Sequence, residues 1–551
     1  MKERFIALLL LASPGLARGA EAPSLNDVAA ARGLVARHQN GARGEWFFPE
    51  IMGSGAALVD WDGDGDLDAY LVQGAVLSAT SGPGKWPSRQ DRLLRNDLGA
   101  MPRFVDATAG RVPALPGYGF GVAVADADLD GDADLLVSAF GPQALLVNGG
   151  AGVLIDRSRS SGVAEETWGV SASFFDADRD GDPDLGLSRY VRFQAATNPK
   201  CYVPSSARDY CGPDAFEPLS TRFFRNLGGG SFEDQSGRVG FNGASGAGLG
   251  TVAADFDGDG WIDLYVANDG DPNHLWKNLG GQRFEETGLF AGCALNRLGL
   301  AEASMGVDAG DFDRDGDDDL FMTHLRGETN TLYRAEGGGL FEDRTPEAGL
   351  AAPSLPMTGF GTLWADLDLD GWLDLLVTNG DVRQADLPEQ KGDAFPFRQP
   401  GQLFLNRKGR FEEVSARFPD VAREVVGRGA AFGDVDGDGD ADVLLWPSGG
   451  PAALLENRLA TGRPWLGLRL LAARGGWDAL GATAELATRG GRMRRRVRTD
   501  GSYASAHDPR LVFALGEAEQ PLSVSVAWPG GQRERWRGLE QNLYYTLRET
   551  R

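Results

Sequence analysis

Short apolar runs alternate with acidic, glycine-containing stretches along most of the chain. Typical apolar runs are GAALV at 55–59, GVAVA at 121–125 and LYVAN at 264–268. Short apolar runs of this kind, rich in Val, Leu and Tyr and bounded by Gly and Asp, predict β-strands rather than helices. The pattern extends from about residue 21 to about residue 460 and predicts an all-β fold for this part.

Seven nine-residue loops join pairs of these runs, and we number them one to seven in chain order. Each loop has Asp at positions one, three, five and nine and Gly at position six, where a sharp turn can fold the carboxylates around one centre. The predicted metal ligands are Asp60, Asp62, Asp64 and Asp68; Asp126, Asp128, Asp130 and Asp134; Asp176, Asp178, Asp180 and Asp184; Asp255, Asp257, Asp259 and Asp263; Asp311, Asp313, Asp315 and Asp319; Asp366, Asp368, Asp370 and Asp374; and Asp434, Asp436, Asp438 and Asp442.

The four carboxylates of one loop repel each other unless a cation neutralises them. A hard divalent ion with oxygen ligands suits the pattern, and calcium fits such a loop better than magnesium. An EF-hand is excluded, because position twelve is apolar in every copy and a strand, not a helix, follows. We therefore expect about seven structural Ca²⁺ ions, each at the tip of a β-hairpin. The alternative is a solvated acidic turn, which could hold for a single copy.

The loops recur within units of roughly 50 to 55 residues, which suits a four-stranded propeller blade. In each unit a third strand ends near Asn, and a fourth strand follows as Phe-x-Asp/Glu, as in Phe104–Asp106. Only six fourth strands follow the loops, and the seventh, Leu25-Asn26-Asp27, precedes the first loop. The sequence therefore predicts a seven-bladed β-propeller over residues 21–460, in which the N-terminal strand completes the last blade and closes the ring.

Three long insertions, 74–92, 188–222 and 378–401, all connect a second strand to a third strand. Strand alternation puts them on the face opposite the Asp loops, where long loops on a rigid scaffold commonly bind a partner. The alternative is tolerated surface elaboration. Cys201 and Cys211 lie in the second insertion and are expected to form a disulfide, which leaves Cys293 as a buried free thiol.

Residues 461–551 lack Asp loops and alternate as strands, for example WLGLRLL and LSVSVAWP. This part predicts a small β-sandwich-like domain. Its basic run, Arg494, Arg495, Arg496 and Arg498, is expected to be a solvated strand face, with an anion-binding patch as the alternative.

The net charge of −25 argues against nucleic-acid binding, because a phosphate backbone would be repelled. Residues 1–20 have Lys2 and Arg4 before the apolar run FIALLLLA and small residues after it, which predicts a cleaved signal peptide. The apolar run is too short to span a bilayer and no Cys for a lipid anchor follows it. We expect a secreted, periplasmic or cell-surface protein with no membrane span.

The Asp loops with their flanking strands resemble FG-GAP/VCBS repeats, as in the integrin α-subunit propeller. The segment GLVARHQNG…PEIMGSGAALVDWDGDGDLDAYLVQG resembles bacterial relatives of cartilage acidic protein, and WDALGATAEL…GSYASAHDPRLVFALG…VAWPGG resembles the ASPIC/UnbV domain that ends those proteins. The resemblance covers nearly the whole expected mature chain. It implies a secreted, calcium-binding, adhesion- or matrix-like protein and defines no ligand.

No catalytic constellation is recognisable in the sequence. None of the four His residues has zinc-ligand spacing, and no nucleophile elbow or phosphate-binding loop occurs in a fitting context. The leading hypothesis is a non-enzymatic module that binds a protein or glycan through the insertion face. The alternatives are a glycan-active enzyme using the same face, with Asp209 or Asp381 as acid or base, and an assembly factor for another exported protein.

Overall fold

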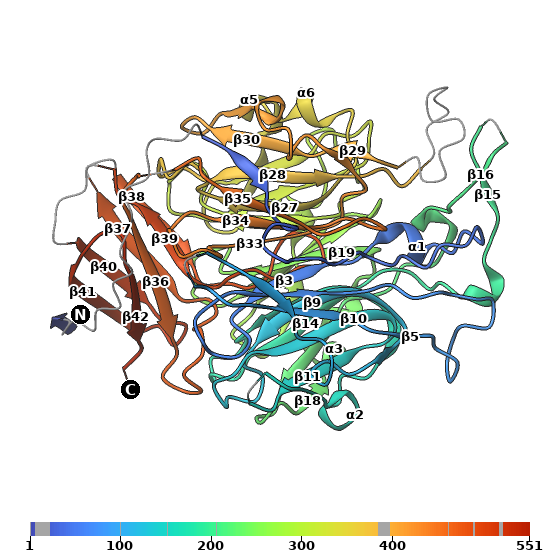
Figure 1. The fold of residues 1–551 in the computed structure, drawn as a ribbon, viewed down its shortest axis with the longest axis horizontal. Helices are drawn as coiled ribbons and strands as arrows, with labels where there is room; N and C mark the ends of the chain where they lie inside the picture. Colours follow the sequence, from blue (N-terminus) through green and yellow to red (C-terminus); the bar gives the residue numbers. More distant parts are fainter. Residues whose placement is uncertain are drawn as a thin grey trace.

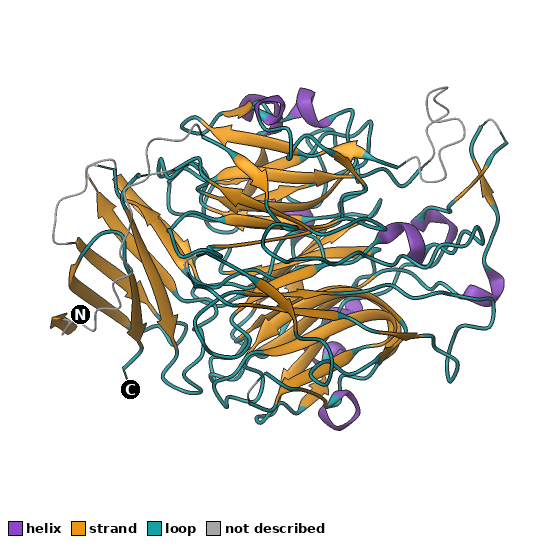
Figure 2. Cartoon of the chain, in the orientation of Figure 1, coloured by secondary structure: helices purple, strands orange, loops and turns teal. Residues whose placement is uncertain are grey.

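The structure is a computed structural model, and it describes residues 2–5, 23–99, 101–150, 152–204, 206–383, 397–460, 462–488, 491–516 and 522–550. Short strands make up its sheets, and its helices are single turns (Figures 1 and 2). The described α-helices are α1 Pro49–Met52, α2 Ser158–Ser161, α3 Ser236–Val239, α4 Gly288–Ala291, α5 Thr345–Ala348 and α6 Ala351–Ser354. The all-β prediction is confirmed.

Antiparallel four-stranded units form the larger part of the described chain, and each Asp loop joins the first two strands of one unit. The units are β3 Ala56–Val59, β4 Asp68–Leu71, β6 Arg92–Asn96 and β7 Phe104–Asp106; β9 Tyr118–Ala125, β10 Asp134–Pro142, β11 Ala144–Asn148 and β12 Leu154–Asp156; β13 Glu166–Phe175, β14 Asp184–Arg189, β17 Arg222–Asn226 and β18 Phe232–Asp234; β19 Gly248–Ala254, β20 Asp263–Asn268, β21 His274–Asn278 and β22 Phe284–Glu286; β23 Val307–Gly310, β24 Asp319–Met322, β25 Thr331–Ala335 and β26 Phe341–Asp343; β27 Gly359–Ala365, β28 Asp374–Asn379, β30 Gln402–Asn406 and β31 Phe411–Glu413; and β33 Gly429–Gly433, β34 Asp442–Trp446, β35 Ala453–Asn457 and β2 Leu25–Asp27.

The acidic residue that ends each fourth strand caps the turn that follows it. Asp234 Oδ1, for example, accepts the Ser236 amide at 2.9 Å, and Ser236 Oγ in turn accepts the amide of Phe223 in β17 at 2.9 Å. Asp106, Asp156, Asp343 and Glu413 accept an amide two residues further on in the same way. The Phe-x-Asp/Glu pattern therefore encodes both a strand and the turn that leads into the next unit.

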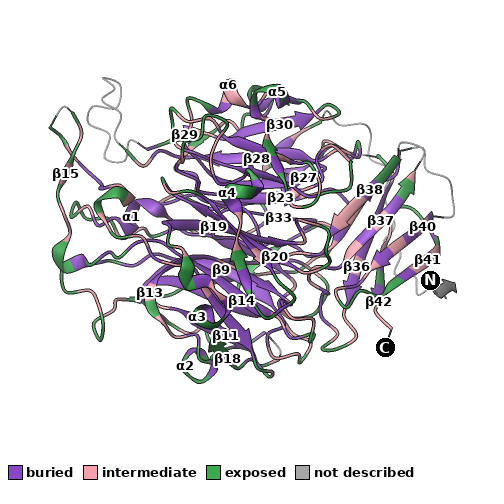
Figure 3. Ribbon diagram, turned by 180° about the vertical axis from the view of Figure 1, so that it is seen from behind, coloured by how far each residue is buried: buried purple, intermediate pink, exposed green. Residues whose placement is uncertain are grey.

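The first strands of successive units contact one another in the order β3, β9, β13, β19, β23, β27, β33, and β33 also contacts β3. The N-terminal β2 pairs with β35 through Leu25 opposite Asn457 and Asp27 opposite Leu455, so the expected pairing of this segment with the last unit is present. One buried hydrophobic cluster joins Ala56 and Leu58 of β3 to Ala431 and Trp446 of the last unit. The inner strands are buried along their length (Figure 3).

The three insertions leave the units between the second and third strands, as predicted. The first insertion contributes β5 Ser88–Arg89, which pairs with β8 Leu115–Pro116 outside the insertion. The second insertion contains a hairpin in which β15 Cys201–Tyr202 pairs with β16 Arg208–Asp209. The third contributes β29 Gln399–Pro400, which pairs with β32 Glu424–Val425, and its residues 384–396 lie outside the described part. The β15–β16 hairpin and α1 lie together at the end of the molecule opposite the C-terminal domain (Figure 1).

The predicted disulfide is present, with Cys201 and Cys211 joined at an S–S distance of 2.02 Å. Cys293 is a buried free cysteine, as expected. None of the described helices has the length and apolar character needed to cross a membrane.

The C-terminal domain consists of two sheets that enclose one hydrophobic core. Their strand orders are β1-β41-β40-β37-β38 and β39-β36-β42, and the bounds are β36 Trp465–Leu471, β37 Thr483–Thr488, β38 Gly491–Arg496, β39 Leu511–Ala514, β40 Leu522–Ala527, β41 Arg533–Leu539 and β42 Tyr544–Arg548. Each of the expected strands is found, whereas β41 is an addition. The added strand β1, Lys2–Phe5, pairs in parallel with β41; residues 6–22 of the expected signal peptide lie outside the described residues.

Candidate metal centres

The glycine at position six gives every Asp loop its turn. All seven of these glycines, Gly65, Gly131, Gly181, Gly260, Gly316, Gly371 and Gly439, have φ between 88° and 105°. Such values are costly for residues with a Cβ, so the predicted need for glycine is confirmed. In loops two to four and six to seven the glycine amide donates to the position-one carboxylate at 2.9–3.1 Å, which holds the turn closed.

Position four is a second left-handed position that the sequence interpretation overlooked. It is Gly63, Gly258 or Gly437 in three loops, but Leu129, Arg179, Arg314 or Leu369, with φ of 49–65°, in the others. The presence of glycine in three of the seven copies was the available signal. The nine-residue loop therefore has left-handed backbone on both sides of the carboxylate at position five, and position four is strained only where it is Leu or Arg.

The aspartate at position nine clamps the base of every loop. Its Oδ2 accepts the amide of position two at 2.9–3.2 Å in all seven loops. Its Oδ1 accepts an amide at the end of the third strand at 2.7–2.8 Å. The position-five carboxylate similarly accepts the position-seven amide at 2.9–3.2 Å. These bonds fix the carboxylates before any ion binds.

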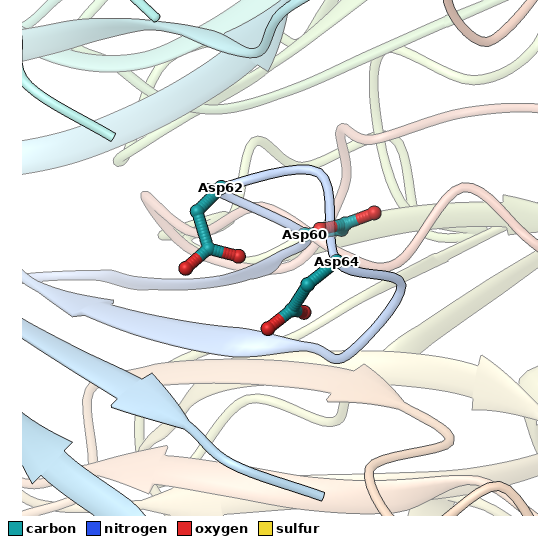
Figure 4. Close-up of side chains that lie close together, drawn as sticks. All are labelled: Asp60, Asp62 and Asp64. Carbon is teal, nitrogen blue, oxygen red and sulfur yellow. The ribbon is translucent and has the colours of Figure 1, made fainter. Parts of the chain in front are cut away.

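The carboxylates at positions one, three and five converge. In the first loop Asp60, Asp62 and Asp64 each offer an oxygen, and these oxygens lie within 4.8 Å of one another (Figure 4). The same holds for the corresponding trios of loops three, four and five, and in the second loop the trio is Asp126, Asp128 and Asp134. Position nine thus joins the cluster in loop two.

Each loop also leaves a buried carboxylate oxygen without a hydrogen-bond donor among the described residues. These are Oδ1 of Asp62, Asp128, Asp176, Asp178, Asp182, Asp255, Asp311, Asp368, Asp436 and Asp440. Those of Asp182 and Asp368 lie 3.4 Å from Arg474 and 3.6 Å from Arg463. A buried anionic oxygen with no partner is expensive, and a bound cation would satisfy it. The oxygen-only donor set suits a hard divalent ion such as calcium.

Burial, reinforced by the neighbouring carboxylates, raises the pKa of several loop aspartates. The pKa reaches about 8 for Asp68, Asp134 and Asp184, and about 7 for Asp126 and Asp366. Desolvation is the largest cause in each case, and repulsion from the other loop aspartates adds to it. An ion at the centre would reverse this repulsion and keep the carboxylates charged.

The C-terminal domain sends one segment between the first strands of the units, which the sequence interpretation did not anticipate. This axial segment, Thr499–Asp508, is buried along its whole length. It forms at least one hydrogen bond with the first strand of every unit: Ala506 and Ser505 bond to β3, Ala504 and Thr499 to β9, Ala504 to Ser171 of β13, Asp500 to Ala253 of β19, Ser502 to Val307 of β23 and Thr362 of β27, and His507 and Asp508 to Phe432 of β33. The available signal was a stretch of small polar residues without strand alternation.

Arginines of the C-terminal domain face the Asp loops. Arg494 Nη1 and Arg496 Nε contact Asp318 at 2.8 and 3.2 Å, and Arg495 lies 3.8 Å from Asp366. Arg498 pairs with the buried Asp308 at 2.6 Å. The basic run is therefore neither a solvated strand face nor an anion-binding patch, and both expectations were wrong. It binds the acidic loop face of the same chain.

The two candidate catalytic acids, Asp381 and Asp209, are buried and interact with neighbouring residues. Asp381 is buried, pairs with Arg326 at 2.6 Å and accepts the Thr358 hydroxyl at 3.3 Å. Asp209 is buried in β16 and its Oδ1 accepts the Tyr210 amide at 2.9 Å. His324 is buried too, and its Nε2 lies 3.0 Å from Ser304 Oγ.

The insertion face carries a groove of about 860 Å³ between residues 79–86, 165–168 and 189–196, which we call the insertion groove. Trp86, Phe140 and Phe193 line it, and the Trp86 and Phe140 rings meet edge to face at 5.1 Å. Glu165, which also lines the groove, pairs with Arg189 at 2.7 Å and Arg222 at 3.2 Å. The groove combines aromatic surface with fixed charged groups, as small-ligand sites do.

Two family profiles match the chain. The profile described as FG-GAP-like repeat matches residues 255–322 and 311–377, and the profile described as ASPIC and UnbV matches residues 473–551. The chain contains FG-GAP-like repeats and an ASPIC and UnbV domain. The FG-GAP matches contain loops four to six, and the ASPIC and UnbV match contains the axial segment.

Curated relatives of this FG-GAP-repeat protein are named cartilage acidic protein 1. The mouse protein is 27% identical over 180 residues, covering 31% of this chain and 26% of the relative, and that of Xenopus tropicalis is 25% identical over 280 residues, covering 49% and 40%. The matched part thus spans less than half the length of these relatives. The relationship supports the resemblance inferred from the sequence motifs.

Solved structures show a distant likeness. An Agrocybe aegerita lectin described as recognising non-reducing terminal N-acetylglucosamine has a TM-score of 0.37 and 16% identity, covering 65% of this chain and 88% of the lectin. A structure described as YCF48 bound to D1 peptide has a TM-score of 0.41 and 9% identity, covering 80% and 100%. Similarity at this level carries no information about a ligand of the FG-GAP-repeat protein.

Proposed function

We propose that this chain is an exported, non-enzymatic binding module: a closed seven-bladed propeller, held rigid by about seven calcium ions, that binds a protein or glycan through its insertion face. The buried carboxylate oxygens without donors, present in every Asp loop, carry the calcium part of the proposal. The pairing of β2 with β35 and the contact of β33 with β3 support the closed ring.

In each loop the carboxylates at positions one, three, five and nine would hold the ion. Calcium would supply a central charge that the loop needs for neutrality, while the clamps at positions five and nine keep the carboxylates in place. The ion has a structural role here, since the hairpin tips connect the first two strands of each unit and the first strands build the centre of the ring.

We propose the insertion face as the partner site because the Asp-loop side and the centre of the propeller are covered by the C-terminal domain. The C-terminal domain contacts several Asp loops, for example Arg469 with Asp60 at 3.4 Å and Tyr544 with Asp434 at 2.8 Å, and the axial segment fills the centre. The insertion groove lies among the insertions, away from the loops, and its aromatic and charged lining offers contacts to a partner.

Bound calcium per chain and the melting temperature with and without chelator test the scaffold. We expect about seven ions; at roughly 1 mM calcium, and with a Kd of roughly 0.1 mM for each site, each ion would stabilise the fold by about 1.4 kcal/mol. Chelation should therefore lower the melting temperature strongly. An unchanged melt with no bound calcium would mean that the loops are acidic turns only.

Retention on a panel of immobilised glycans and candidate exported proteins tests the partner site. We expect Trp86→Ala to abolish retention, whereas Phe290→Ala, which removes an 88% exposed aromatic ring outside the groove, should retain it. The same assays report product formation. If new reducing ends or unsaturated sugars form, the hypothesis of a non-enzymatic binding module is rejected in favour of a glycan-active enzyme.

A further inference from the structure

Basic side chains of the units reach the Asp loops in five places. Arg225 Nη1 lies 2.6 Å from Asp178 and 2.8 Å from Asp184, and Lys277 pairs with Asp257. Arg334 contacts Asp313 at 2.6 Å and Asp315 at 3.1 Å, Arg407 contacts Asp368 at 3.2 Å, and Arg95 lies 3.8 Å from Asp62. In each case the contact includes the carboxylate at position three.

These cations occupy a recurrent place in the sequence. Arg95, Arg225 and Lys277 each directly precede the Asn that ends the third strand, Arg334 precedes Ala335 in the same register, and Arg407 follows Asn406. In four of the five loops the counter-ion comes from this place, and in loop six it comes from the residue after the Asn. Arg458 has the position of Arg407 in the last unit, but it pairs with Glu456.

Loops two and seven lack this cation. The residue before the Asn is Val147 in the second unit and Glu456 in the last. Glu456 forms ion pairs with Arg32 and Arg458, which lie outside loop seven. Among the described residues, no Lys or Arg side chain forms an ion pair within 4.0 Å with a carboxylate of either loop. Arg157 acts on the Asp128 carboxylate at longer range, and Arg510 Nη2 donates to the main-chain carbonyl of Asp434 at 2.8 Å.

Loops two and seven, which have no lysine or arginine counter-ion in the described part of the chain, also contain buried carboxylate oxygens without a hydrogen-bond donor. Asp128 Oδ1 in loop two and Asp440 Oδ1 in loop seven are buried and have no donor among the described residues, and Asp440 is only 4% exposed. Calcium entering loops two and seven would not have to displace an ion pair between a loop carboxylate and a Lys or Arg of the described residues. In the other five loops it must displace an ion pair, which costs part of its binding energy.

We propose that the seven loops form two calcium classes, with loops two and seven binding more tightly than the five loops that carry their own lysine or arginine. The inference rests on the proposed calcium-held scaffold and adds an order of filling to it. The difference expected for one lost ion pair is about tenfold in Kd. The five compensated loops would keep part of their neutrality when calcium is scarce.

Calcium titration by calorimetry, with bound calcium counted by equilibrium dialysis, tests the two classes in the full chain. The wild type should show two tight sites and a weaker set. Lys277→Val copies the side chain of loop two into loop four and should raise the tight count to three. Val147→Lys makes the reverse exchange and should lower it to one. Arg92→Val, which removes a basic residue of β6 that pairs with Asp106 instead of a loop, should leave two.

Melting in chelator verifies that each variant is folded before its calcium binding is compared. A single class of equivalent sites, or tight counts that do not move with the two exchanges, would overturn the two-class inference while leaving the calcium scaffold intact. The absence of any bound calcium would overturn the scaffold and the classes together.

Discussion

At the scale of single residues, the loops depend on backbone conformations as much as on carboxylates. Gly316 at position six of loop five has φ of 105°, and no atom lies within 4 Å of a Cβ placed there. A substitution at this site therefore reports on backbone strain alone. The sequence indicated the role of position six correctly because glycine is invariant there, and it did not reveal position four because Leu129 and Arg179 occupy the same conformation.

We expect Gly316→Ala to lower the free energy of unfolding by about 1–2 kcal/mol, because alanine is strained at this φ. The measurement is chemical denaturation at fixed calcium. Gly82→Ala is the control, since Gly82 has no positive φ and open space around it. Equal losses for the two variants would contradict the strain argument.

Glu50 of α1 is a titratable residue that the sequence interpretation did not single out. It is buried, and Tyr210 donates a hydroxyl hydrogen bond to its Oε2 at 3.2 Å. Burial, with a smaller contribution from Glu45, raises the pKa of Glu50 to about 7. Because the folded state binds the proton more tightly than the unfolded state, this group's contribution to stability is full below about pH 4.5 and is lost as the pH rises to 7.

We therefore expect Glu50→Gln to be more stabilising at pH 8 than at pH 5, by about 2–3 kcal/mol, because glutamine stays neutral. Melting temperatures of the variant and the wild type at the two pH values provide the measurement. Glu285→Gln, an exposed change in β22, is the matched control. A pH-independent effect at Glu50 would show that its carboxyl is already charged in the fold.

At the scale of elements, an asparagine at the end of the third strand links each unit to the loop before it. The side-chain amide donates to the carbonyl of position two in the preceding loop, at 2.8–3.3 Å. The six bonds run from Asn96 to Val435, Asn148 to Trp61, Asn226 to Ala127, Asn278 to Ala177, Asn406 to Phe312 and Asn457 to Leu367. The bond from Asn96 connects the first unit to loop seven, the last loop of the chain. The fifth unit has Ala335 at this place and is the exception.

Asn406→Ala should cost about 1–3 kcal/mol, because the buried carbonyls of Phe312 and Leu373 each lose a donor. The free energy of unfolding at saturating calcium measures the loss. The fifth unit offers the reciprocal change: Ala335→Asn would place a donor opposite the position-two residue of loop four, Phe256. We expect it to cost less than Asn406→Ala, and a larger cost would show that the linking bond is not transferable between units.

Much of the element order could be predicted from the sequence because it repeats. Strand pairs around each loop, the Phe-x-Asp/Glu strand and the pairing of Leu25–Asp27 with the last unit all followed from comparing copies within the chain. Elements that occur once lacked this support. Strand β41, Arg533–Leu539, carries charged residues at alternate positions, and its apolar face is limited to residues such as Trp536 and Leu539. The arginines of β38 looked solvated because their acidic partners lie far away in sequence.

At the scale of the whole molecule, the two domains form one structural unit. The axial segment supplies hydrogen bonds to the first strands of the units, so the packing of these strands and that of the C-terminal domain depend on each other. Arginines from the C-terminal domain form ion pairs with aspartates of the Asp loops. A cation bound in these loops would reduce their negative charge and so weaken the ion pairs. Sequence periodicity could not show this arrangement, because the segment belongs to neither the repeat nor a strand.

Asp500 provides a test of this coupling. Its Oδ2 accepts the Ala253 amide of β19 at 2.7 Å in a buried setting. Asp500→Ala leaves that amide without its acceptor and should cost about 1–3 kcal/mol. If the domains unfold together, calorimetry will show one transition that shifts as a whole, because the lost bond belongs to both. Thr546→Ala, an exposed change in β42, should leave the transition in place. Two separate transitions, with only one of them moved by Asp500→Ala, would mean that the axial segment joins the domains without making them cooperative.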